Sequence, residues 1–139
     1  MSEIVNRVSE SGLLTLDLEN FVSNNEIVEV DIAEQLWQGL ALKEKDFREW
    51  IKTNDWSFFE GKSVYIHCSV DAIIQSWAYM LIASSLVQFT DSFIVGDKVS
   101  LEQKLIKENI SKIDLSELTD KRVVIKGCSD VSSPNFGMV

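Results

Sequence analysis

The stretch from Gly61 to Val87 reads GKSVYIHCSVDAIIQSWAYMLIASSLV and contains the most apolar segment of the chain. It opens with a strand-like run over residues 63–67, passes Cys68 and Asp71, and then carries no charged side chain from residue 72 to residue 90. This order predicts a strand, a polar corner and a buried helix. The segments on either side are expected to cover that helix.

Composition places the chain among ordinary globular proteins. Its 139 residues are 45% hydrophobic and 25% charged, and only one proline is present. This length suits one domain. The net charge of −9, with basic residues dispersed along the chain, argues against a nucleic-acid partner, because phosphate binding depends on clustered Lys and Arg.

The sequence predicts a location in the cytoplasm. The first residues, MSEIVNRVSESG, lack the apolar run of a signal peptide. The uncharged segment is interrupted by Gln, Ser and Thr and is flanked by Asp71 and Asp91, so a buried helix is favoured over a membrane span. Two cysteines without an export signal indicate free thiols in a reducing compartment.

The N-terminal half is expected to hold short elements. Residues 2–9 suit one or two helical turns, and alternating apolar residues predict a β-hairpin over residues 13–30. Asp31 followed by Glu34 has the form of a capping box, so a helix is predicted to begin near Ile32. A second helix is expected over residues 43–52.

The second half alternates strands with helices. Beyond the central stretch we predict a strand over 92–95, a helix opening at Ser100, a turn capped by Asp114 and a buried interior strand over 122–126. Such alternation is typical of a parallel sheet with right-handed crossovers. The predicted fold is therefore a single α/β domain, residues 1–139, with a mixed, mainly parallel sheet, helices packed on it and an N-terminal β-hairpin.

Candidate site residues follow from that fold, because ligands of α/β proteins bind beyond the carboxyl ends of the strands. Three such ends are expected, after residues 67, 95 and 126. The predicted ligand-binding residues there are Asp71, Gly96, Asp97 and Asp130, and the predicted metal ligands are Cys68 and Cys128.

The chemistry of the two thiols stays open between several hypotheses. A metal site would need a further ligand such as a carboxylate, and the wide separation of Cys68 and Cys128 matches no zinc-finger spacing. His67 is adjacent to Cys68 on a strand, so the two side chains should point to opposite faces, and this makes His67 a poor base for a thiol enzyme. Buried cysteines serving as small apolar residues are the remaining alternative.

Several segments together resemble the uncharacterised domain-of-unknown-function family 2480. They are SEIVNRV, QGLALKEKDFREW, CSVDAI with SWAYMLIAS, and DKRVVIKGC. The resemblance implies a sequence that continues past the second cysteine to a third one, so a C-terminal part is expected to be missing and residues after Ser132 are expected to be mobile unless a partner covers them. It also suggests, without specifying an activity, a link to iron–sulfur assembly.

The leading functional hypothesis is a cytoplasmic accessory protein with a thiol-containing metal, iron–sulfur or small-ligand site. A cysteine-dependent enzyme is the first alternative, so enzymatic activity stays undecided. A structural dimerisation module is the second, because the apolar side chains of the central helix cover nearly its whole circumference and a second subunit could close one side. A homodimer or another protein is the expected kind of partner.

Overall fold

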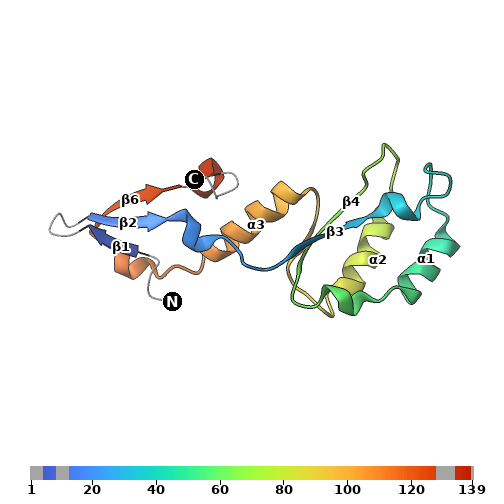
Figure 1. The fold of residues 1–139 in the computed structure, drawn as a ribbon, viewed down its shortest axis with the longest axis horizontal. Helices are drawn as coiled ribbons and strands as arrows, with labels where there is room; N and C mark the ends of the chain where they lie inside the picture. The colour runs from blue at the N-terminus through green and yellow to red at the C-terminus, as the bar shows by residue number, and fades with distance from the viewer. Residues whose placement is uncertain (1–4, 9–12, 128–133, 139) are drawn as a thin grey trace. The chain divides into compact units, whose positions relative to one another are not determined.

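The computed structural model describes residues 5–8, 13–127 and 134–138 (Figure 1). Its strands are β1 (Val5–Val8), β2 (Leu13–Asp17), β3 (Ile27–Asp31), β4 (Ser63–His67), β5 (Phe93–Val95) and β6 (Arg122–Lys126). Its α-helices are α1 (Glu44–Thr53), α2 (Ser76–Leu86), α3 (Lys98–Ile110) and α4 (Pro134–Met138). Short 3₁₀ helices are η1 (Leu18–Phe21), η2 (Ile32–Gln35), η3 (Trp56–Phe59) and η4 (Leu115–Leu118).

The chain is α/β, and it divides into two compact units. The central unit comprises residues 25–101, and the discontinuous unit comprises residues 1–24 and 102–139. Each unit has its own three-stranded sheet, in the order β3-β4-β5 in the central unit and β1-β2-β6 in the discontinuous one. Parallel pairing was predicted correctly. The prediction of a single sheet is wrong, because β2 pairs with β6 in one sheet and β3 pairs with β4 in the other.

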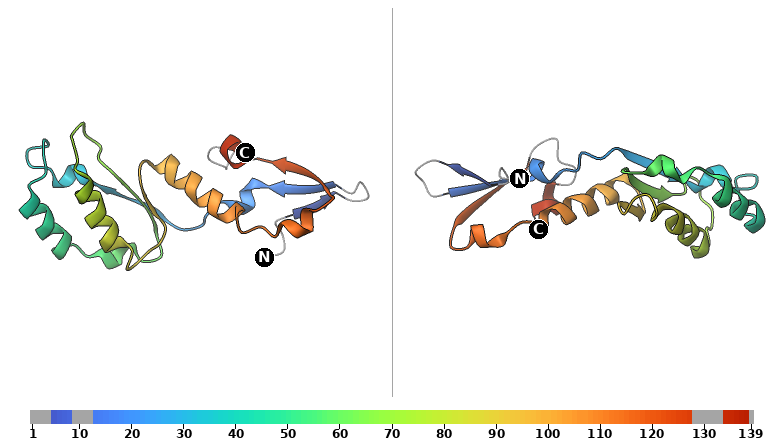
Figure 2. Two further views of the ribbon diagram at one scale, coloured as in Figure 1. Left: turned by 180° about the vertical axis from the view of Figure 1, so that it is seen from behind. Right: turned by 90° about the horizontal axis from the view of Figure 1, so that it is seen from below.

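The sheet of the central unit is entirely parallel. β4 lies in the middle, with Asp31 of β3 opposite His67 and Val95 of β5 opposite Ile66. Side chains alternate along β4, so that Val64 and Ile66 are fully buried on one face. They pack in one core with Phe47 of α1 and with the buried face of α2. Figure 2 shows α1 and α2 side by side in this unit.

Helix α2 buries one stripe rather than its whole circumference. Ala78, Ile82 and Leu86 follow the i, i+4, i+8 spacing and are fully buried, whereas Met80 is 69% exposed. The predicted burial on all sides is therefore wrong for the described structure. The helix covers only part of the uncharged segment, because Gln75 is extended and α2 begins at Ser76.

The discontinuous unit has a smaller core. Leu18, Phe21 and Ile106 form its buried centre, with Leu16, Ile110 and Ile113 packed around them. Its sheet pairs β2 antiparallel with β1 and parallel with β6. Helix α4 lies close to this core, because a Cβ placed on Gly137 would come within 3.1 Å of Leu18 Cδ1.

The predicted hairpin over residues 13–30 is wrong. β2 pairs with β6 and β3 pairs with β4, both in parallel, so β2 and β3 do not pair with each other. Alternation of apolar residues identified both strands correctly but carries no information about the partner. Residues 5–8, predicted to be helical, instead form a strand beside β2.

The end of the chain also differs from expectation. β6 is an edge strand with Val124 46% exposed, although its apolar run predicted an interior strand buried on both faces. Beyond it, residues 134–138 form helix α4, so part of the segment expected to be mobile has regular structure. Residues 128–133 and 139 lie outside the described part of the chain.

Aspartates start several of the helical elements. Asp31 caps η2 through Ala33 N–H at 2.9 Å, so the predicted start at Ile32 is confirmed, although the element is one 3₁₀ turn. Asp114 caps η4 as predicted. Asp97 accepts from Ser100 N–H at 2.8 Å, which moves the start of α3 to Lys98. No described helix is both long and apolar enough to cross a bilayer.

Candidate functional site

The carboxyl ends of β3, β4 and β5 meet along one edge of the central sheet. Asp31 ends β3, His67 ends β4 and is followed by Cys68 and Ser69, and Gly96 follows β5. Gly96 N–H donates to Ile66 O at 2.9 Å and so joins the end of β5 to the end of β4. Because ligands of parallel sheets bind beyond such an edge, these residues define the candidate site.

Cys68 and His67 lie on opposite faces of the sheet, as their adjacency predicts. Cys68 is half-buried against the core on the face that α1 and α2 cover, and its thiol donates to Val70 O at 3.4 Å. His67 Nε2 instead lies 2.7 Å from Glu29 Oε2. The single histidine of the chain is therefore engaged away from the thiol.

A polar cluster of Glu29, Tyr65 and His67 occupies the second face of the sheet. Tyr65 OH donates to Glu29 Oε2 at 3.5 Å, and the rings of Tyr65 and His67 lie 5.2 Å apart. Burial, followed by the negative charge of Glu29, raises the pKa of Tyr65. The phenol therefore stays protonated and serves as a hydrogen-bond donor to the carboxylate.

Asp31 joins β3 to the loop that carries the thiol. Its Oδ1 accepts from Ala33 N–H and, at 3.0 Å, from Ser69 N–H. Burial raises the pKa of Asp31, but the hydrogen bonds from Ser69 and Ala33 and the nearby His67 outweigh it and leave the pKa below its ordinary value of 3.8. The ionised carboxylate thus fixes the backbone immediately after Cys68.

Not all of the predicted site residues meet at this edge. Cys68 and Gly96 lie on it, and Gly96 has a φ of +154°, a backbone conformation that favours glycine. Asp97 is exposed and its carboxylate caps α3, and the hydrogen bonds from Ser100 lower its pKa. Asp71 is exposed in the loop before α2.

The third predicted strand end belongs elsewhere. β6 is part of the discontinuous unit and of its own sheet, so its end does not extend the edge of the central sheet. Cys128 and Asp130, which follow β6, lie outside the described residues. Among the residues that the structure describes, no three His, Cys, Asp or Glu side chains gather closely enough to hold a metal ion.

Sequence reasoning missed Glu29 and Tyr65 and read Asp31 only as a helix cap. The available signal was the alternation along β3 and β4, where Glu29 and Asp31 in one strand and Ser63, Tyr65 and His67 in the other occupy alternate positions. In register, Glu29 lies opposite Tyr65 and Asp31 opposite His67. That pairing became visible only once the two strands were known to be parallel partners.

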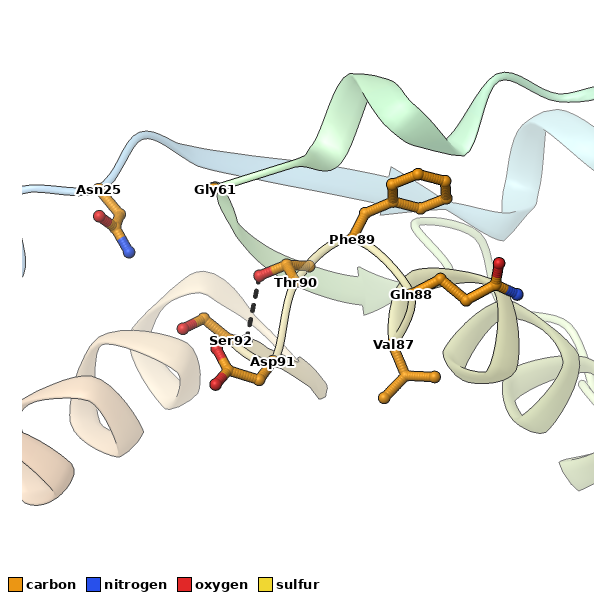
Figure 3. Close-up of a pocket in the computed structure, with 8 residues that line it drawn as sticks. All are labelled: Asn25, Gly61, Val87, Gln88, Phe89, Thr90, Asp91 and Ser92. Atoms are coloured by element: carbon orange, nitrogen blue, oxygen red, sulfur yellow. Dashed lines mark hydrogen bonds between the residues drawn. The ribbon is translucent and has the colours of Figure 1, made fainter.

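A hollow lies at the other end of the same strands (Figure 3). It has a volume of about 370 Å³ and is lined by Asn25, Gly61, Val87, Gln88, Phe89, Thr90, Asp91 and Ser92. Thr90 Oγ1 donates to Lys62 O at 2.6 Å and accepts from Ser92 N–H, so this threonine holds the turn into β5. Of the predicted site residues, those within the described part of the chain do not line the hollow.

The fold and the site define an α/β protein with a polar, thiol-bearing edge on a small parallel sheet. The chain belongs to a family described as protein of unknown function (DUF2480), which it matches over residues 2–139. The match runs to the last residue and gives no sign of the missing C-terminal part that the resemblance implied. No curated protein and no solved structure matches the chain.

Replacement of Asp31 by alanine is expected to loosen the loop after Cys68. The variant loses the acceptor for Ala33 and Ser69, which should lower the free energy of unfolding by about 1–2 kcal/mol at pH 7 and speed hydrogen exchange at the Ser69 amide. Because the pKa of Asp31 is lowered on folding, this stabilisation is present above pH 3.8 and disappears as the pH falls through the folded value.

Asp55→Ala is the matched control, because Asp55 caps η3 in the same unit through Ser57 N–H. This control should also be destabilised but should leave exchange at Ser69 unchanged. Unaltered Ser69 exchange in Asp31→Ala would contradict the assigned hydrogen bond.

Proposed function

We propose that this chain is an accessory protein that binds a small ligand at the carboxyl edge of the central sheet, with the thiol of Cys68 as a binding group. The observation that carries the proposal is the meeting of three parallel strand ends at that edge, where Cys68 and Ser69 follow β4 and Gly96 follows β5. Parallel strand ends expose backbone groups that a ligand can use. The unpaired thiol of Cys68 fits the reducing cytoplasm as the proposed location.

Binding is favoured over cysteine catalysis because, among the residues that the structure describes, Cys68 lacks a positioned base. A thiol enzyme pairs its nucleophile with a base within hydrogen-bond distance. His67 is held by Glu29 on the other face, and the thiol itself donates to a backbone carbonyl. Tyr79 lies near the thiol, but burial, followed by the negative charge of a Cys68 thiolate, raises the pKa of this phenol, so it is poorly suited to accept a proton.

A metal ion or an iron–sulfur cluster is the alternative ligand at this edge. It would require a further thiolate or carboxylate in addition to Cys68, and the two residues predicted for this role, Cys128 and Asp130, lie outside the described residues. Thiolates and carboxylates are suitable ligands for such metals. The link to iron–sulfur assembly rests on this alternative, which the experiment below separates from a small organic ligand.

Replacement of Cys68 by serine is expected to abolish ligand retention. The protein is purified without oxygen, bound small molecules are detected by native mass spectrometry, and metal and sulfide are quantified. Cys128→Ser is the matched control, since it removes the other thiol of the chain. We expect a bound organic species in wild type and in Cys128→Ser and its loss in Cys68→Ser.

Other outcomes of that experiment are equally informative. Stoichiometric metal in wild type that is lost in both variants would indicate a metal site that uses both thiols, in place of the organic ligand. Equal retention of ligand in all three proteins would contradict a role for Cys68. Alkylation of Cys68 in the Cys128→Ser protein faster than alkylation of a free thiol would favour the enzyme instead.

Self-association through α2 is a second candidate function. Met80, Ser84 and Val87, here called the α2 stripe, share one helical face by their i, i+4, i+7 spacing, and Met80 and Val87 are largely exposed. The segment from residue 72 to residue 90 is uncharged in a chain of net charge −9. Two copies could therefore meet along this stripe without opposing like charges at the contact.

Light scattering tests this second candidate. At micromolar concentration the wild-type particle should have about twice the chain mass of 15.8 kDa, and Met80→Glu should be monomeric because it places a charge in the contact. Gln88→Glu adds the same charge beside the stripe and should leave the dimer intact. A monomeric wild type would remove this candidate.

A further inference from the structure

A cavity in the discontinuous unit lies outside the site described above. Its volume is about 420 Å³, and its described lining comes from α3 and the turn after it, Lys107, Ile110 and Ser111, and from α4, Phe136 and Gly137. The first three share one face of the helix and its continuation by their i, i+3, i+4 spacing. A cavity of this size is within the range of small-ligand sites.

Apolar side chains form the walls of this cavity. Ile110 is half-buried against the core formed by Leu18, Phe21 and Ile106, and Phe136 is 40% exposed. The absence of a side chain at Gly137 lets α4 approach that core closely, because a Cβ at this position would lie only 3.1 Å from Leu18 Cδ1. A ligand with an apolar body would bury the open part of the Phe136 ring.

Lys107 supplies the charge at the cavity. Its ammonium group is not needed to cap the C-terminal carbonyls of α3. The last four carbonyls of α3, from Lys107 to Ile110, already accept hydrogen bonds from Ser111 N–H, Ser111 Oγ–H, Lys112 N–H and Ile113 N–H respectively. The neighbouring Glu108 pairs with Lys104 at 3.6 Å. Within the described residues no carboxylate lies at ion-pair distance from Lys107.

We propose that this cavity binds a small amphipathic carboxylate, with its apolar body between Ile110 and Phe136 and its carboxylate at the Lys107 ammonium. Lys107 is the one ionisable side chain in the described lining. A monoanion with an apolar body matches both the walls and this charge. The net charge of the whole chain, −9, has the same sign as the ligand, so the preference for an anion must come from the cavity itself.

Isothermal titration calorimetry of the full chain with octanoate tests the proposal. We expect saturable binding of one octanoate per chain and weaker binding of octylammonium, which has the same apolar chain and the opposite charge. Lys107→Ala should weaken octanoate binding about two- to fivefold, the effect of an exposed ion pair. Phe136→Ala should weaken it by about fivefold or more through lost apolar contact.

Lys112→Ala is the matched control, because it removes the same charge from the same unit but does not line this cavity. It should bind octanoate like wild type. Lys107→Glu should reverse the preference and bind octylammonium more tightly than octanoate, a change that altered folding alone would not produce. Absence of saturable octanoate binding, equal losses in Lys107→Ala and Lys112→Ala, or an unreversed preference in Lys107→Glu would overturn the proposal.

Discussion

The parallel pairing of β3 with β4 is the constraint on which the candidate site depends. Val30 and Ile66 lie opposite each other and are buried together in the core that α1 and α2 cover. Once that face is fixed, strand alternation turns Glu29 and Tyr65 to the other face. A shift of one residue in register would exchange the two faces, so burial of the apolar side chains also specifies where the polar ones gather.

The same constraint separates the two kinds of chemistry at the carboxyl edge. Cys68 follows the strand on the helix-covered side, where its thiol is half-buried, whereas His67 is held by Glu29 on the opposite face. The thiol and the imidazole therefore cannot act as one catalytic pair in this fold. Asp31 connects the end of β3 to the loop after Cys68, because its carboxylate caps η2 and also accepts a hydrogen bond from Ser69 N–H.

Local signals predicted the elements well, and long-range pairing is where sequence reasoning failed. The apolar stripe of residues 43–52 and the run at 63–67 specify a helix and a strand by their own periodicity. The strands at 13–17 and 27–31 were found in the same way, but alternation is equally consistent with any partner, so a hairpin was wrongly favoured. For the same reason, the apolar run of β6 did not reveal that it lies at a sheet edge. At the candidate site, Cys68 and Gly96 could be predicted from strand ends alone, whereas Glu29 depended on knowing which strand lies beside β4.

Nuclear Overhauser effects between backbone protons of the isotope-labelled chain test this account most directly. Parallel pairing of β3 and β4 predicts cross-strand contacts between residues 27–31 and 63–67, in the register that sets Glu29 opposite Tyr65 and Asp31 opposite His67. It likewise predicts contacts between residues 13–17 and 122–126. Contacts between residues 13–17 and 27–31 in the antiparallel order of a hairpin, without contacts between 27–31 and 63–67, would contradict the fold and the candidate site built on it.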